Sequence, residues 1–450
     1  MLEHQAWMKL APDMMIAWQQ AMDEGKNAEK FQASCEMIAK ESKTQDREKE
    51  AEAMEAVLLA APVRPDYPYQ EPSDYAGIVS TLPEGEEAKK DVFIADLREH
   101  IAGAWIGRIA GCLLGKPLEG LRMDKILPIL QCTGNYPMNR YVDSREFTEE
   151  LRRKVDFSLL EPWQKCWVDT IGDAAPVDDD TNYTVFALKI VQKYGRNFRS
   201  CDVLEGWLQW IPMFATCTAE RVAYRNGACG LLPPGTAFRK NPYREWIGAQ
   251  IRGDFFGYIN PGNPRRAAEM AFRDASISHV KNGIYGEMYI AAMIAKAAVC
   301  GEPMEIIKAG LREIPPRSRL HEAVERVIGW YEEKISWDEV EKRIHGEWNE
   351  WIQHHWCHTV SNAMIVTAAI LWGEGDFGKS ICQAVQIGFD TDCNGATVGS
   401  ILGMMLGKEK IPASWSKAFH ERLRTSIDGF PVVSVEQLAE MTCELIRTPS

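Results

Sequence analysis

The chain has 450 residues, 46% hydrophobic and 26% charged, and this balance is ordinary for a globular protein that buries a sizeable core. The net charge of −13 excludes the basic footprint of nucleic-acid binding, so we expect no nucleic-acid partner. We expect no membrane association either, because no apolar run reaches spanning length and the N-terminus lacks a signal-peptide pattern. The 12 cysteines include no Cys-x-x-Cys pair, which favours a cytoplasmic location.

Helical periodicity dominates the chain. Apolar residues recur at helical spacing over residues 1–60, which predicts a helical N-terminal extension. Residues 61–92 are rich in proline and turn residues and predict an extended connector. Over residues 93–450 one amphipathic run follows another without alternating strands, so we predict an all-α main domain, a compact multi-helix orthogonal bundle. Within it, residues 217–264 carry many turn signals and predict long ordered loops of functional importance.

Two glycine ladders with a four-residue period lie far apart in the chain. Such a period places each ladder along nearly one face of a helix. Because a glycine inside a helix costs about 1 kcal/mol relative to alanine, close approach of two backbones is the expected reason for the ladders. We predict that the two helices pack against each other and bring Glu119 and Asp390 to one site. The ladders consist of Gly103, Gly107, Gly111 and Gly115, and of Gly395, Gly399, Gly403 and Gly407.

Two acidic clusters each precede a predicted helix: Asp178, Asp179 and Asp180 in one, Asp390 and Asp392 in the other. Helix capping explains one or two acids at such a position, because a carboxylate accepts from free backbone N–H groups. It explains poorly three adjacent carboxylates, which repel one another. Hard divalent cations prefer carboxylate, hydroxyl and water oxygens. The spacing therefore leaves two alternatives, a metal centre or capping with solvated charge.

Three motifs give the chain a resemblance to a known family. GRIAGCLLGKPLEG, VDDDTNYT and GFDTDCNGATVGSILG stand in the order found in the ADP-ribosylglycohydrolase family, also called dinitrogenase reductase-activating glycohydrolase-like proteins. The chain resembles this family over roughly residues 95–410 and looks like a divergent branch of it. The resemblance implies an all-α fold with a dinuclear magnesium centre. It also implies hydrolysis of a glycosidic bond at a ribose, typically the bond that attaches ADP-ribose to a side chain.

The resemblance also implies roles for individual residues. It places ligands for two Mg²⁺ ions, with Mn²⁺ as the alternative, at Asp178, Asp179, Asp180, Asp390 and Asp392. Cys393 stands where a metal-binding threonine is usual, and a thiol is a poor ligand for Mg²⁺. Glu119 matches the acid that ends the first motif, whereas Cys112 replaces an aspartate. We predict that the cations hold sugar hydroxyls and activate water, and that Glu119 or Asp179 moves the proton as the catalytic residue.

Several residues are predicted to contact a small-molecule or ribosylated substrate. Asn226 and Gly227 begin the counterpart of a family loop whose backbone amides cradle a diphosphate, although the Met-Arg that usually follows is missing. His279 resembles a family histidine near the substrate, and His358 and Asn362 share one helix face. The predicted substrate-binding residues are Asn226, Gly227, Arg252, His279, His358 and Asn362.

Three alternatives remain open at this stage. The histidines and cysteine of EWNEWIQHHWCHTV, namely His354, His355, Cys357 and His358, offer ligands for zinc, but their spacing matches no standard module. The altered phosphate loop favours a hydrolase of another small glycoside or nucleoside over one that acts on ADP-ribose. The replacement at Cys393 keeps open a non-catalytic protein that binds ADP-ribose or a nucleotide.

Overall fold

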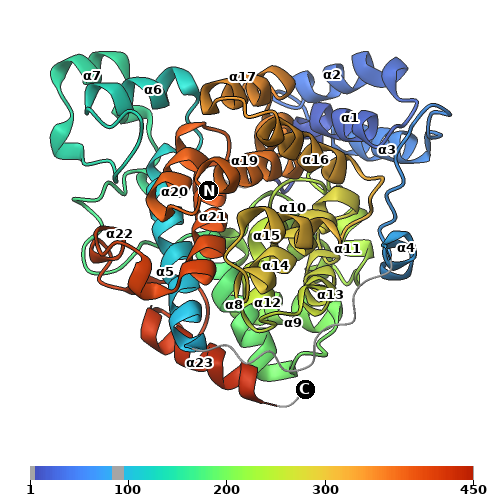
Figure 1. Ribbon diagram of the computed structural model, residues 1–450. Coiled ribbons are helices and arrows are strands. Elements are labelled where there is room, and N and C mark those ends of the chain that lie inside the picture. Colours follow the sequence, from blue (N-terminus) through green and yellow to red (C-terminus); the bar gives the residue numbers. More distant parts are fainter. Residues whose placement is uncertain (1–5, 84–95, 449–450) are drawn as a thin grey trace.

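The computed structural model describes residues 6–83 and 96–448, and helices make up most of it (Figure 1). The first helices are α1 (Met14–Asp23), α2 (Gln32–Glu41), α3 (Glu48–Ala60) and α4 (Tyr75–Thr81). The middle of the chain forms α5 (Leu97–Gly115), α6 (Met123–Cys132), α7 (Glu149–Lys154), α8 (Asp179–Tyr194), α9 (Ser200–Trp210), α10 (Thr218–Ala228), α11 (Gly235–Phe238), α12 (Asp254–Tyr258), α13 (Pro264–Ala275) and α14 (Lys281–Ala297). The last part forms α15 (Pro303–Leu311), α16 (Arg319–Glu332), α17 (Trp337–Glu347), α18 (Gln353–Cys357), α19 (Thr359–Trp372), α20 (Phe377–Gln386), α21 (Thr391–Leu406), α22 (Ser414–Lys417) and α23 (Val435–Arg447). The prediction of a mainly helical fold is confirmed.

The two glycine ladders face each other, as predicted. They lie on α5 and α21, which run antiparallel through the molecule, since Gly103 approaches Gly403 at one end and Gly111 approaches Gly395 towards the other. A methyl group added at Gly107 would overlap the backbone carbonyl of Gly399. The two backbones are therefore in direct contact, with no side chain between them, and only glycine fits at these positions.

A large apolar core surrounds this helix pair. Nearly every residue of α14 is buried, and this helix packs against α12, α13, α15 and α21. α19 is also buried over almost its whole length. Helices that are apolar on all sides are typical of the centre of a large helical domain, where other helices cover every face. Among the described residues, no helix combines the length and the apolarity needed to cross a bilayer.

The N-terminal helices α1, α2 and α3 form a small apolar cluster of their own, beside the main core (Figure 1). Buried polar contacts join them to the main domain: Glu24 accepts from Arg244 at 2.8 Å, and Gln20 donates to Glu245 at 2.6 Å. The predicted connector is extended over most of its described part but includes the short helix α4, which Asp74 caps. Residues 84–92 of that connector lie outside the described residues.

Two local predictions need correction. Residues 422–434 contain a short antiparallel hairpin, β1 (Arg422–Arg424) with β2 (Val432–Ser434), in which Leu423 faces Val433. Strands of three residues are too short to show the alternation that predicts a strand. Residues 217–264 do not form one long loop, because α10, α11 and α12 lie within them. Frequent glycine and proline there mark the ends of short helices.

Candidate active site

The two acidic clusters meet beside the end of the glycine ladder. Asp178 is the N-cap of α8, and one of its oxygens accepts the backbone N–H of Asp180 at 2.9 Å. Asp390 and Asp392 lie at the start of α21. The hydroxyl of Thr391 donates to the carbonyl of Gly115 at 2.8 Å, which fixes the start of α21 against the end of α5. Glu119 ends the short helical turn Lys116–Leu118 that follows α5, and the helix pair brings it to Asp390 as predicted.

The acidic side chains form one continuous cluster. Ligand atoms of Glu119, Asp390 and Asp392 lie within 4.8 Å of one another, and so do those of Asp180, Asp392 and Cys393. A third such group joins Asp178 and Asp180 to the thiol of Cys112. Six carboxyl groups make up what we call the carboxylate cluster: Glu119, Asp178, Asp179, Asp180, Asp390 and Asp392.

Four members of the cluster are buried, whereas Glu119 and Asp179 are half-buried. Burial, followed by the charges of Asp178 and Asp392, raises the pKa of Asp179 to about 7. Burial and the neighbouring Asp392 raise the pKa of Glu119 well above its ordinary value. Burial likewise raises the pKa values of Asp180, Asp390 and Asp392. Glu119 and Asp179 therefore combine solvent access with raised pKa values, and only Asp179 has a pKa of about 7, near neutral pH.

Two cations from α5 and its end reach into the cluster, and the sequence arguments did not anticipate either. The ammonium of Lys116 forms an ion pair with Asp178. Burial alone would raise the pKa of Asp178, but the charge of Lys116 and the hydrogen bonds to this carboxylate together outweigh burial and keep the pKa below its usual value. Arg108 donates to Asp180 at 2.8 Å and lies 3.5 Å from Asp254. The signal in the sequence was the spacing of four between Arg108, Cys112 and Lys116, which places all three on one helix face.

The arrangement fits a divalent cation. Asp392 Oδ1 and Asp180 Oδ2 are buried and have no hydrogen-bond partner within residues 6–83 and 96–448. A buried carboxylate oxygen without a partner is unfavourable, and a cation relieves that cost. The donors are mainly carboxylate oxygens, which suit Mg²⁺ or Mn²⁺ better than they suit soft metals. The sulfur of Cys393 is the exception.

Of the residues predicted to bind substrate, Asn362 lies closest to the cluster: its side-chain oxygen accepts the backbone N–H of Asp390 at 3.3 Å. The expected phosphate loop at Asn226 and Gly227 is wrong, because both belong to α10. The amide of Asn226 donates to the carbonyls of Thr236 and Arg239, and Gly227 packs against Leu204. Asn226 and Gly227 therefore make contacts within the protein.

Two further candidates are also engaged inside the protein. Arg252 is buried and pairs with Glu220 at 2.6 Å and with Asp274 at 2.5 Å. His279 is buried, and its Nδ1 lies 2.8 Å from the hydroxyl of Ser278. Burial and nearby Arg252 lower the pKa of His279 well below its usual value, so this imidazole is neutral. Both side chains stabilise the packing behind the cluster.

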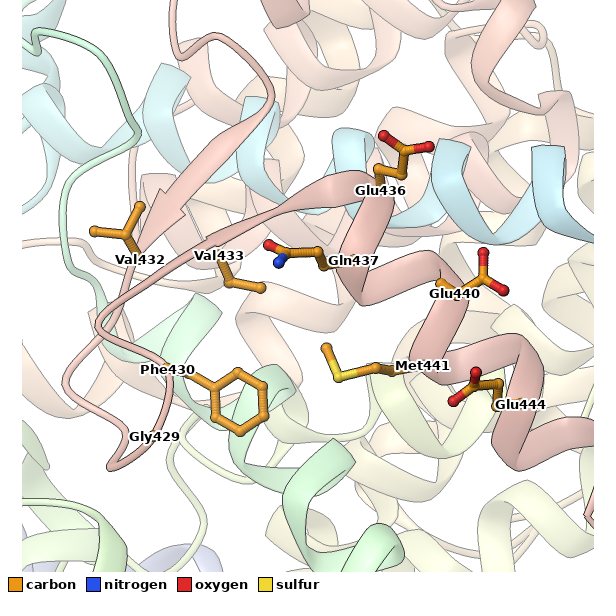
Figure 2. A pocket seen from close by; sticks show the side chains of 9 residues that line it. All are labelled: Gly429, Phe430, Val432, Val433, Glu436, Gln437, Glu440, Met441 and Glu444. Carbon is orange, nitrogen blue, oxygen red and sulfur yellow. The ribbon is translucent and has the colours of Figure 1, made fainter.

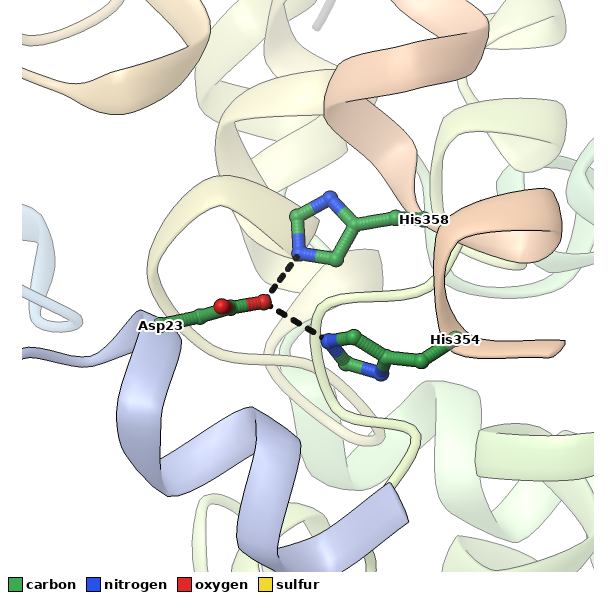
Figure 3. Close-up of side chains that lie close together, drawn as sticks. All are labelled: Asp23, His354 and His358. Carbon is green, nitrogen blue, oxygen red and sulfur yellow. Dashed lines mark hydrogen bonds and ion pairs between the residues drawn. The ribbon is translucent and has the colours of Figure 1, made fainter. Parts of the chain in front are cut away.

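His358 belongs to a second polar group, which Figure 3 shows with Asp23 of α1 and His354. His354 Nε2 lies 2.8 Å from Asp23 Oδ2, and His358 Nε2 lies 4.0 Å from the same oxygen. The other nitrogen of each ring is an acceptor: His354 Nδ1 receives the indole N–H of Trp246, and His358 Nδ1 receives the backbone N–H of Val360.

These hydrogen bonds fix the protons of both imidazoles. A neutral ring that accepts at Nδ1 carries its proton on Nε2, and an indole N–H can only donate. Burial lowers the pKa of His358 to about 3, so its ring is neutral. Both Nε2 atoms therefore present N–H groups to Asp23. A protonated nitrogen has no lone pair for a metal, and the zinc alternative is not supported at these atoms.

A surface hollow of about 470 Å³ lies between the C-terminal hairpin and α23 (Figure 2). Phe430, Val433 and Met441 line it, and the acids of α23 stand along its edge. It shares no residue with the carboxylate cluster, so it is separate from the candidate active site.

The family model described as ADP-ribosylglycohydrolase matches residues 94–448 of this chain. The chain belongs to the ADP-ribosylglycohydrolase family. It is therefore a glycosidic-bond hydrolase, and the resemblance drawn from the three motifs is confirmed. The carboxylate cluster, built from those same motifs, is the candidate active site of this family member.

Among solved structures, the chain is similar to one titled "ADP-ribosylglycohydrolase-related protein complex". The two share 18% sequence identity with a TM-score of 0.47, over 78% of this chain and 98% of the other. No curated protein matches the chain.

Proposed function

We propose that this protein hydrolyses a ribosyl glycosidic bond with the help of divalent cations of the magnesium type bound at the carboxylate cluster. The observation that carries the proposal is the meeting of two acidic helix starts, in which only Glu119 and Asp179 are partly open to solvent. The family resemblance implies two such ions, with Asp178, Asp179, Asp180, Asp390 and Asp392 as their ligands.

We assign the proton steps to Asp179, one of the two half-buried acids. Cleavage of a glycosidic bond needs a proton for the leaving group and a base for the attacking water. A carboxyl group with a pKa of about 7, as at Asp179, exists in both protonation states at neutral pH and can serve either step. Glu119, the other half-buried acid, lies with Asp390 and Asp392 where a cation can use its carboxylate. A bound divalent cation supplies positive charge that polarises sugar oxygens and lowers the pKa of water.

A second candidate substrate differs from the first in its distal half. Asn226 and Gly227 are built into α10, so they do not offer the backbone cradle for a diphosphate that the sequence suggested. This favours a nucleoside or another small glycoside as an alternative to an ADP-ribosyl group. Membership of a family of hydrolases argues against a protein that only binds ADP-ribose or a nucleotide.

The test is a hydrolysis screen in Mg²⁺ across ADP-ribosylated peptides, ADP-ribose derivatives, nucleosides and aryl glycosides. For the substrate found, Asp179→Asn is expected to lower kcat by about 10²–10⁴-fold, the range for a general acid or base. Asp392→Asn should abolish the dependence on Mg²⁺ together with turnover. Asp66→Asn, which alters a largely exposed acid, is the matched control and should keep full activity. Full activity of Asp392→Asn, or turnover unaffected by a chelator, would contradict the proposal.

We also propose that the protein works in the cytoplasm. None of its 12 cysteines forms a disulfide, and several are buried among apolar side chains. Reduced cysteines of this kind are typical of a reducing compartment.

A further inference from the structure

One face of α5 and the turn after it meets the aspartates at the start of α8. Arg108, Cys112 and Lys116 are spaced four residues apart, so they follow one another along that face. The side chains of Arg108 and Lys116 are 0% and 6% exposed. Buried cations need buried partners, and each of these two has an aspartate: Asp180 for Arg108 and Asp178 for Lys116.

These contacts occupy oxygens that a metal ion would need. Both oxygens of Asp178 are engaged, one by the ammonium of Lys116 and the other by the backbone N–H of Asp180. Arg108 holds Asp180 Oδ1, which leaves Oδ2 as its free oxygen. The remaining donor beside Asp180 and Asp392 is the sulfur of Cys393, a poor ligand for a hard cation. A cation on this side of the cluster would have to compete with Lys116 for Asp178 and with Arg108 for Asp180, and only Asp179 and Asp180 Oδ2 would be open to it without that competition.

The other side of the cluster lacks such competition. Within the described parts of the chain, none of Glu119, Asp390 and Asp392 forms an ion pair with a lysine or arginine. Their ligand atoms lie within 4.8 Å of one another, and Asp392 Oδ1 is buried without a hydrogen-bond partner. Three carboxylates that converge without a side-chain cation form the place where a divalent ion is held most favourably.

We propose that this centre holds a single divalent cation, bound by Glu119, Asp390 and Asp392. Arg108 and Lys116 take the place of a second ion by neutralising Asp180 and Asp178. The inference rests on the proposed cation requirement and departs from the two ions expected from the family resemblance. It makes Lys116 a positioning residue, which sets the metal content of the site without contacting the substrate.

The experiment counts bound Mn²⁺ per chain, by equilibrium dialysis with elemental analysis and by electron paramagnetic resonance of the bound ion. The wild-type protein is expected to bind one Mn²⁺ with the spectrum of an isolated ion. Lys116→Met removes the charge and keeps an apolar stem, so it should bind a second ion, and ions about 3.5–4 Å apart should show spin coupling. Lys125→Met, at a half-exposed lysine of α6, is the matched control and should bind one.

Two ions per wild-type chain would overturn the proposal while leaving the cation requirement intact. A single ion in a folded Lys116→Met protein would overturn the role given to Lys116. No bound ion in any variant would contradict the cation requirement itself. If Lys116→Met fails to fold, the count for the wild-type chain still decides between one ion and two.

Discussion

Asp179 differs from its neighbours in the triplet because its side chain is half-buried and no cation holds it. Lys116 pairs with Asp178 and Arg108 with Asp180, whereas Asp179 forms no ion pair with a described residue. The charge of Lys116 offsets the rise in the pKa of Asp179 only in part, and the pKa stays at about 7. This combination makes Asp179 the residue of the triplet best suited to exchange protons with a substrate.

The titration of Asp179 should be visible in the stability of the cation-free protein. Its pKa is about 7 in the folded state and 3.8 as the ordinary value, so the folded chain holds this proton over a range in which the unfolded chain has lost it. The contribution of Asp179 to stability is then greatest below about pH 4 and falls as the pH rises towards 7. Asp179→Asn cannot ionise, so it should lose less stability over this range.

The measurement is the melting temperature of the wild-type protein and of Asp179→Asn, each in the presence of a chelator, at a series of pH values. Other carboxyl groups with raised pKa values contribute equally to both curves. The difference between the two curves therefore reports the titration of Asp179. Parallel curves would show that the pKa of Asp179 is not raised in the folded state.

At the scale of elements, the contact between α5 and α21 depends on the absence of side chains. Gly107→Ala would place a methyl group against the carbonyl of Gly399, and the helices would have to separate. We expect a loss of about 1–3 kcal/mol or more in the free energy of unfolding, as for other overpacked cores. Chemical denaturation measures it.

The matched control is Gly329→Ala in α16, where an added methyl group meets nothing within 4 Å. This change should instead stabilise the chain by up to about 1 kcal/mol, the helix propensity of alanine over glycine. Equal stability of the two alanine variants would show that the ladder does not depend on close backbone contact.

The docking of α1 onto the main domain depends on Asp23. Asp23→Ala would leave the Nε2–H of His354 buried without its acceptor and remove the negative charge beside His358. A buried donor without a partner costs about 1–3 kcal/mol. We expect limited proteolysis to cut the N-terminal helices faster in this variant, whereas Asp46→Ala, at an exposed acid, should behave as the wild type. Unchanged cleavage of the Asp23 variant would indicate that other contacts hold α1.

For the whole molecule, the carboxylate cluster links cation binding to folding. A cation that binds only the folded chain stabilises it, by about 2.7 kcal/mol when its concentration is 100 times the dissociation constant. Mg²⁺ should therefore raise the melting temperature, and a chelator should lower it again. Asp392→Asn should remove this shift, and Asp66→Asn should retain it. A shift of equal size in both variants would place the binding of Mg²⁺ elsewhere.

The parts of the fold and site that could be predicted from sequence have periodic or local signals. The four-residue glycine period indicated both helices and their contact, and acids directly before a helix pattern marked the starts of α8 and α21. The position of Asn226 could not be predicted in this way, because nearby glycines and prolines that end short helices look the same as those of a loop. Its side chain is directed by contacts with Thr236 and Arg239.

The partners of Lys116 and Asp23 could not be predicted from the sequence, for a different reason. Lys116 meets an aspartate 62 positions later, and Asp23 meets a histidine 331 positions later. A sequence shows that a charge exists, but the choice of partner is made by the packing of helices that are remote in the chain. For residues whose function depends on a distant partner, the structure is therefore needed to identify that partner.

The bond between Thr391 and Gly115 has a consequence for biosynthesis. The two residues are 276 positions apart, so at about 5–20 residues per second a ribosome needs roughly 14–55 s to make the second after the first. During that interval α5 exists without α21, and the surface that α21 will cover stays open to other chains. The active site is thus completed late in synthesis, and slow or interrupted translation between α5 and α21 prolongs the time in which the nascent protein can aggregate.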